Sequence, residues 1–308
     1  MSTAHRLVDG LSWMRTLIVN VAYVGTDEGW VLVDAGVRGY ASTIAGAARG
    51  LFGSHRPPRA VVLTHAHFDH VGSLRALLRE WDVPVFAHEL ELPYLTGRSS
   101  YPPPDPLVGG GAMAWMAKLY PRRPIDVGDR AQALPSDGSV PFMPGWRWVA
   151  TPGHSPGHVS FIRERDRALI AGDAVITTRQ ESLFAVAAQR VELHGPPAYY
   201  TQNWYAAAQS VRTIADLAPS VMVSGHGVPL AGPELGPGLR ALADRFEQEE
   251  VPRHGRYVVH PARADERGLV WVPPDPLPRA VMRGMAPIAA VLAGAMIARR
   301  LFSRREKT

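Results

Sequence analysis

The feature that most constrains this chain is a dense group of polar side chains in the stretch Thr64-His65-Ala66-His67-Phe68-Asp69-His70. Three imidazoles and one carboxylate fall within six positions. The preceding residues 59–63 form a short apolar run that predicts a buried strand, and residues 71–78 place leucines on one face of a helix. The group therefore lies on a strand-to-helix turn, where several side chains converge on one point.

Imidazole nitrogens and carboxylate oxygens are ligands that zinc and related divalent metals accept in proteins. Two such ions about 3.5–4 Å apart share a bridging water and make it reactive near neutral pH. A solvated, histidine-rich turn is the alternative. Three further segments disfavour it, because each places a polar residue just past an apolar or turn-forming run: His154 in 151–158, Asp173 after 169–172, and His226 after 221–225.

These segments, taken in their order along the chain, resemble the motifs of the metallo-β-lactamase superfamily of hydrolases. The resemblance extends from about residue 16 to about residue 232. It rests on five motifs: Asp34 in Leu32-Val33-Asp34-Ala35-Gly36, the His65-x-His67-x-Asp69-His70 block, His154, Asp173 and His226.

The resemblance implies a division of the metal ligands into three sets: His65, His67 and His154 for a first ion, Asp69, His70 and His226 for a second, and Asp173 between them. Asp34 is expected to orient the cluster without binding metal. Asp69 is expected to carry a proton as well. The expected cofactors are two divalent ions, zinc first, with manganese or iron as alternatives.

The resemblance and the alternation of strand-like and helix-like segments predict an αββα sandwich, with two mixed β-sheets face to face and helices on both outer faces. Strands are expected at 16–24, 29–34, 83–87, 147–150, 159–163 and 168–171, and helices at 40–52, 206–217 and 235–249. Residues 1–272 are predicted to form one metallo-hydrolase domain. Residues 273–308 are predicted to form a proline-rich linker and an apolar C-terminal helix with a basic flank.

The apolar part of that tail, Gly284–Ala298, would span about 22 Å as a helix. This is shorter than the roughly 30 Å hydrocarbon core of a membrane. Packing on the protein body is therefore the first interpretation, a weak membrane-surface contact the second, and a true span the third. No signal peptide is evident in residues 1–10, so a cytoplasmic location is expected, or a membrane-peripheral one through the C-terminus.

Composition narrows the function classes. The 308 residues include no cysteine, which excludes disulfides, thiolate metal ligands and a cysteine nucleophile. It also removes a zinc ligand that several true β-lactamases of the resembled family use. The net charge of +5 comes from scattered arginines rather than from a basic stripe with aromatics, so no nucleic-acid partner is expected. A small-molecule substrate is expected, and the oligomeric state is left open.

The predicted reaction is hydrolysis of an ester, lactone or thioester by a hydroxide that bridges the two metal ions. A first alternative is hydrolysis of β-lactams or phosphodiesters. A second, non-hydrolytic alternative is a protein that binds metal or associates with a membrane without catalysis. Redox members of the resembled family carry a glutamate where His67 stands. A flavin domain, which such redox members also carry, is not expected in this chain.

Several residues near the motifs have roles that the sequence leaves open. His158 is expected to support the cluster rather than bind metal. His88 and Glu89 are expected to form a helix cap or a surface pair, not to bind metal. His194, Tyr199 and Tyr200 lie in the stretch 174–204 and are candidates to line the pocket, with core packing as the alternative. The irregular segment 88–148 is expected to shape substrate entry or to be a packed excursion.

Overall fold

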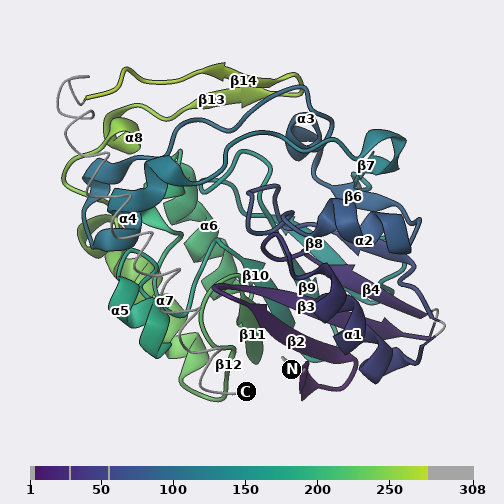
Figure 1. Cartoon of the computed structure of the whole chain (residues 1–308). Coiled ribbons are helices and arrows are strands. Elements are labelled where there is room, and N and C mark those ends of the chain that lie inside the picture. Colours follow the sequence, from purple (N-terminus) through teal and green to yellow (C-terminus); the bar gives the residue numbers. More distant parts are fainter. Residues whose placement is uncertain (1–3, 28, 55, 277–308) are drawn as a thin grey trace, which may run out of the picture.

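The computed structural model describes residues 4–27, 29–54 and 56–276. Two β-sheets lie face to face with helices outside them, as Figure 1 shows. The first sheet has seven strands in sequence order: β1 (His5–Val8), β2 (Leu11–Thr16), β3 (Val19–Thr26), β4 (Gly29–Val33), β5 (Ala60–Val62), β6 (Val85–Ala87) and β7 (Ala131–Ala133). It is antiparallel from β1 to β4 and parallel from β4 to β7.

The second sheet has five strands in the order β12-β11-β10-β9-β8. These are β8 (Trp146–Ala150), β9 (Val159–Arg163), β10 (Ala168–Gly172), β11 (Val221–Ser224) and β12 (Leu230–Ala231). Only β10 and β11 run parallel. A separate hairpin pairs β13 (Arg263–Asp265) with β14 (Gly268–Trp271).

The described helices are α1 (Ala41–Phe52), α2 (Leu74–Glu80), α3 (Leu92–Leu95), α4 (Ala112–Met116), α5 (Leu183–Ala188), α6 (Trp204–Asp216), α7 (Leu235–Glu249) and α8 (Arg256–Val259). Short 3-10 turns are η1 (Glu89–Glu91), η2 (Pro106–Val108), η3 (Ala117–Leu119), η4 (Gly128–Arg130) and η5 (Ala198–Tyr200). In Figure 1, α1 and α2 lie on one side of the molecule and α6 and α7 on the other.

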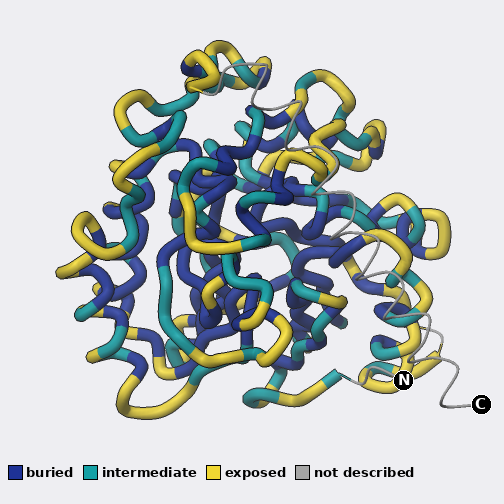
Figure 2. The backbone as a smooth tube through the Cα atoms, turned by 60° about the vertical axis from the view of Figure 1, so that its left-hand side comes forward, coloured by how far each residue is buried: buried dark blue, intermediate teal, exposed yellow. Residues whose placement is uncertain are grey.

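Three apolar layers follow from strand alternation, which sends successive side chains to opposite faces. In β3, Val21 and Tyr23 pack toward α1 and α2, whereas Ala22 and Val24 face the second sheet. The outer face of the second sheet packs against α6 and α7 through residues such as Met222. Figure 2 shows the buried backbone gathered inside, with exposed residues mainly on loops and outer helix faces. The predicted αββα sandwich is therefore confirmed.

One local prediction was wrong, and one element was not predicted. The expected strand 16–24 is interrupted by a tight turn at Leu17, whose φ of 67° lies in the left-handed region. Its two sides belong to β2 and β3, which pair antiparallel. Residues 17–18 continue the apolar pattern of the strands, so the pattern alone does not reveal the turn. The β13–β14 hairpin was also not expected from the sequence.

No helix among residues 4–27, 29–54 and 56–276 is long and apolar enough to cross a membrane. The predicted C-terminal helix and its membrane contact fall on Gly284–Ala298, which lies outside the described residues. The division of the chain at residue 272 stays a prediction.

Asn20 joins the two sheets at the start of β3. Its side-chain Nδ2 donates to the carbonyl oxygens of Ser224 and Gly227, each at 2.8 Å. Its backbone N–H donates to Gly225 O at 2.7 Å. The Asn20 side chain thus donates to two carbonyl oxygens, one at the end of β11 and one just beyond it.

Replacing Asn20 with alanine should lower the free energy of unfolding by about 2–3 kcal/mol, because two carbonyl oxygens lose their buried donor. Chemical denaturation followed by circular dichroism measures this. The control is Asn203→Ala, which removes only the cap that Asn203 Oδ1 provides to Ala206 N at the start of α6. That loss should be about 1 kcal/mol. Equal losses in the two variants would contradict a special role for Asn20.

Candidate metal centre

The motif residues emerge at the carboxyl ends of strands that meet at one edge of the sandwich. Asp34 follows β4, and the His65–His70 block follows its parallel neighbour β5. Asp173 follows β10, and His226 follows its parallel neighbour β11. Carboxyl ends of adjacent parallel strands lie side by side, which is why residues far apart in sequence gather here.

The first half of the cluster is formed by His65, His67 and His154. Their ligand atoms lie within 4.8 Å of one another. The closest pair is His67 Nδ1 and His154 Nε2, at 2.9 Å. The His154 side chain comes from the loop between β8 and β9, so this half joins the two sheets.

The second half is formed by Asp69, His70 and His226, whose ligand atoms also lie within 4.8 Å of one another. His226 Nε2 is 3.5 Å from Asp69 Oδ2. The two halves share Asp173, which groups with His65 and His70.

Asp173 contacts both halves through its two oxygens. Oδ1 is 3.3 Å from His70 Nε2, while Oδ2 is 3.1 Å from His226 Nε2 and 3.3 Å from His154 Nε2. The structure therefore brings all seven predicted ligands together: His65, His67, Asp69, His70, His154, Asp173 and His226.

The donor set fits a divalent metal. All seven side chains are buried, and the most exposed, Asp69, is 7% exposed. Five side-chain atoms of the cluster are buried without a hydrogen-bond partner among the described residues: His65 Nε2, His67 Nε2, His70 Nε2, His154 Nδ1 and Asp173 Oδ1. Buried polar atoms are otherwise almost always paired, and nitrogen and carboxylate oxygen atoms at this spacing suit divalent cations.

Burial and neighbouring charge set the pKa values of the cluster. Burial lowers the pKa of His65 and of His67, and lowers that of His154 to about 3. Burial also opposes the charge on His70 and His226, but the aspartates around them outweigh it and raise their pKa values. Burial raises the pKa of Asp69.

Asp34 orients the second half of the cluster, as predicted from the resemblance. Its Oδ2 accepts from Thr64 Oγ1 and contacts His70 Nδ1, both at 2.8 Å, and its Oδ1 accepts from Thr64 N at 2.9 Å. Thr64 Oγ1 in turn lies 3.1 Å from His65 Nδ1. Asp34 therefore reaches two of the histidines, one directly and one through Thr64.

His158 supports the cluster from behind. Its Nε2 accepts a hydrogen bond from Asp173 N at 2.9 Å, and its Nδ1 is 2.9 Å from Thr151 Oγ1. Both ring nitrogens are therefore engaged within the protein, and burial lowers the pKa of His158 to about 4. A neutral ring that accepts from a backbone N–H has no free lone pair for a metal.

Aromatic residues from the irregular segments cover the cluster. The Tyr200 ring centroid is 4.7 Å from that of His67, and Tyr199 and Tyr200 pack with α4 and with Phe68. Tyr200 is 6% exposed, and its hydroxyl is buried without a hydrogen-bond partner. His194 lies elsewhere, bonded through Nδ1 to Glu250 at 3.0 Å. His88 caps η1 by accepting from Leu90 N at 3.2 Å, as predicted.

Two residues that contact the ligand loops, Glu91 and Tyr101, were not predicted from the sequence. Glu91 is fully buried, and its Oε2 accepts from Ala66 N at 3.0 Å. The Tyr101 ring centroid is 4.2 Å from that of His67. Both residues lie in the irregular segment 88–148, where no periodic pattern distinguishes a buried glutamate from an exposed one.

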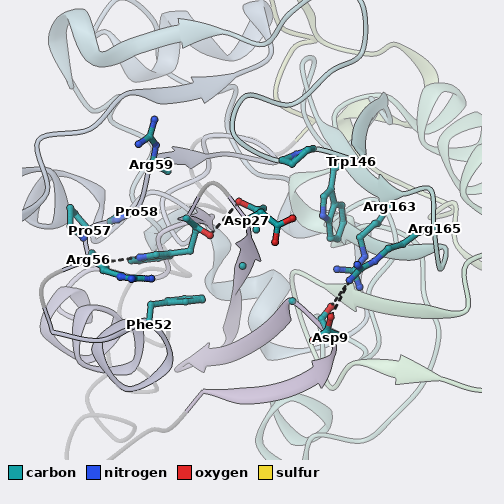
Figure 3. Close-up of a pocket in the computed structure, with 17 residues that line it drawn as sticks. Asp9, Asp27, Phe52, Arg56, Pro57, Pro58, Arg59, Trp146, Arg163 and Arg165 are labelled. Carbon is teal, nitrogen blue, oxygen red and sulfur yellow. Dashed lines mark hydrogen bonds and ion pairs between the residues drawn. The ribbon is translucent and has the colours of Figure 1, made fainter.

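An open groove of about 860 Å³ lies at the other edge of the sandwich (Figure 3). It adjoins Gly29 at the start of β4 and Arg59 just before β5, whereas the cluster follows the ends of these strands. Two of its arginines already have carboxylate partners, with Arg163 bonded to Asp166 at 2.6 Å and Arg165 3.4 Å from an Asp9 oxygen. This groove contributes nothing to the cluster.

Comparison with known proteins agrees with the fold. The family model described as the metallo-beta-lactamase superfamily matches residues 14–226. The chain belongs to the metallo-β-lactamase superfamily. A Bacillus subtilis protein named probable metallo-hydrolase YflN is 44% identical over 240 residues, which cover 77% of this chain and 91% of that protein.

Solved structures of this superfamily share the fold at lower identity. One is a B3 metallo-β-lactamase described as the first with an active-site glutamic acid, with a TM-score of 0.54 and 18% identity over 80% of this chain and 87% of that one. A superfamily protein from Sulfolobus tokodaii has a TM-score of 0.52 and 18% identity, covering 80% and 90% of the two chains. These likenesses concern the fold.

Metal affinity should fall as the pH is lowered from about 8 to about 6. A metal ion must displace the protons that His70 and His226 retain, because aspartates raise their pKa values. His154, whose pKa is about 3, stays neutral over this range and adds no pH dependence. Competition with a chelator of known affinity, repeated across the pH series, measures the slope. A flat profile would contradict the assignment of His70 and His226 as ligands.

Proposed function

We propose that this protein is a metal-dependent hydrolase that cleaves an ester, lactone or thioester bond. The observation that carries the proposal is the buried cluster of five histidines and two aspartates, with five polar atoms left without hydrogen-bond partners. The relative YflN, named a probable metallo-hydrolase, supports the hydrolase class. A metallo-β-lactamase superfamily chain without cysteine favours substrates other than β-lactams.

Two divalent ions, with zinc as the first candidate, would supply an activated water and polarise the electrophilic oxygen of the substrate. His65, His67 and His154 would hold one ion and Asp69, His70 and His226 the other, with Asp173 between them. Such ions would also balance the charge of the two buried carboxylates.

The protein's own groups supply proton transfer and water exclusion. Asp69 is the most exposed of the seven residues, and burial raises its pKa toward the range in which a carboxyl exchanges protons. It is therefore placed to take a proton from the attacking water and deliver it to the leaving group. Phe68, Tyr120 and Tyr200 form an apolar and aromatic wall next to it, which lowers the local dielectric.

Tyr200 is proposed to donate its hydroxyl to the oxygen on which negative charge develops. The hydroxyl has no hydrogen-bond partner in the described part of the chain, although the ring packs against His67. Burial raises the pKa of Tyr200 well above its ordinary value. The phenol therefore stays protonated and can donate a hydrogen bond to the oxyanion.

Removal of metal should abolish hydrolysis across a panel of aryl esters, lactones and thioesters, and zinc, manganese or iron should restore it. The panel should also contain a β-lactam and a phosphodiester as competing substrate classes. Metal content is measured by mass spectrometry on the same samples. Full activity after complete demetallation would reject the proposal, and preferred turnover of the β-lactam or phosphodiester would reject its substrate class.

Tyr200→Phe should lower kcat by about 10²-fold, the usual cost of losing one oxyanion donor, while metal content stays unchanged. The control is Tyr94→Phe, which removes another buried hydroxyl without a partner. Tyr94 stacks on Tyr101 rather than on a histidine of the cluster, at a centroid distance of 3.9 Å. Steady-state kinetics of both variants decide the point. Equal kcat values for Tyr200→Phe and the wild type would remove this role.

A further inference from the structure

Glu91 is a buried carboxylate with four donors around it. It is 0% exposed and lies at the end of η1. Oε1 accepts from Ser155 Oγ and from Gly157 N, both at 2.8 Å. Oε2 accepts from Ala66 N at 3.0 Å and from the Tyr101 hydroxyl. Among the described residues it has no cationic partner, so its charge is balanced by these donors alone.

Three of the four donors come from the loops that carry the first half of the cluster. Ala66 stands between His65 and His67, and Ser155 follows His154 directly. Gly157 approaches so closely that a Cβ there would lie 2.9 Å from Glu91 Cγ. The Glu91 carboxylate therefore bonds two loops, the loop after β5 and the loop between β8 and β9. These loops belong to different sheets, so no strand pairing joins them.

Tyr101 adds a second link between Glu91 and the cluster. Its hydroxyl donates to Glu91 and also accepts from Ala66 N at 3.0 Å. Its ring packs on His67 on one side and stacks on Tyr94 at 3.9 Å and 13° on the other. The orientation of the His67 ring thus depends on the same carboxylate.

Asp34 does the equivalent work elsewhere, because it bonds Thr64 and His70. None of the hydrogen bonds described for Asp34 reaches the His154 loop, and none of those for Glu91 reaches His70. Glu91 therefore bonds the loops of His67 and His154, whereas Asp34 bonds His70 directly and reaches His65 through Thr64.

We propose that Glu91 is the positioning residue of the first half of the metal centre, setting the distance between the loops of His67 and His154. This inference rests on the proposed function only in requiring that the cluster binds a divalent ion. It makes no claim about which bond is hydrolysed. Glu91 itself does not reach the ligand atoms.

An amide cannot replace this carboxylate. Ala66 N and Gly157 N are fixed backbone donors on opposite oxygens of Glu91. In a glutamine, either orientation turns the NH₂ group toward one of these N–H groups, so one loop loses its acceptor and faces a second donor. Glu91→Gln thus changes the spacing of the loops without changing side-chain volume.

The test compares Co²⁺ binding to metal-free wild type, Glu91→Gln and Asp105→Asn, by visible absorption and by chelator competition. Asp105 is a matched control: it is 2% exposed, and its two oxygens accept from Leu107 N and Arg256 N, away from the ligand loops. Glu91→Gln should weaken the binding of one Co²⁺ equivalent by about 10–100-fold and alter its absorption spectrum. Asp34→Asn should weaken the other equivalent more than this one, because Asp34 bonds His70 directly and reaches His65 only through Thr64. Asp105→Asn should weaken neither.

Unchanged Co²⁺ affinity and spectrum in Glu91→Gln would overturn the inference, and so would an equal loss of affinity in Asp105→Asn. If Glu91→Gln fails to fold, Ser155→Ala and Tyr101→Phe each remove one donor and leave the carboxylate in place. Both should then weaken the same Co²⁺ equivalent several-fold, and wild-type affinity in both would overturn the inference. A wild type that binds Co²⁺ but hydrolyses none of the panel would refute the proposed substrate class and leave this inference standing.

Discussion

The rest of the structure depends on the burial of a histidine–aspartate cluster away from water. Asp173 lies within 3.3 Å of three imidazoles, and its position is fixed by His158, which accepts from its backbone N–H. Ionised groups without water are costly unless opposite charge or hydrogen bonds compensate. In this cluster the compensation inside the protein is incomplete, since several ligand atoms lack partners. A divalent cation, as proposed above, would satisfy that remaining demand.

Holding such a cluster in place requires rigid supports around it. The side chains lie at one edge because they follow the strands β4, β5, β10 and β11. Hydrogen bonds from the backbone N–H and the side chain of Asn20 join the two sheets. Asp34 and Glu91 then set the orientation of the loops beyond the strands. Because each support is itself buried and hydrogen-bonded, the ligands are preorganised rather than assembled by the metal alone.

Electrostatics differ sharply between the two edges of the sandwich. At the ligand edge, burial lowers the pKa of some histidines, while aspartates raise the pKa of others. At the opposite edge, the groove of Figure 3 is open, and its charges include exposed arginine–aspartate pairs that solvent screens. Only the first edge combines perturbed titratable groups with convergent ligands, which is the usual mark of a reactive site.

The sequence by itself indicated the helices at 40–52 and 235–249 through their patterns, and it indicated the sandwich and the seven residues of the cluster through motifs that resemble those of the superfamily. Periodicity is a local property, so it is readable without coordinates. Only the tertiary structure decided the role of Glu91, the turn at Leu17 and the placement of Tyr200 over His67. These depend on which loops meet in space, and no repeating pattern along the chain encodes such a meeting.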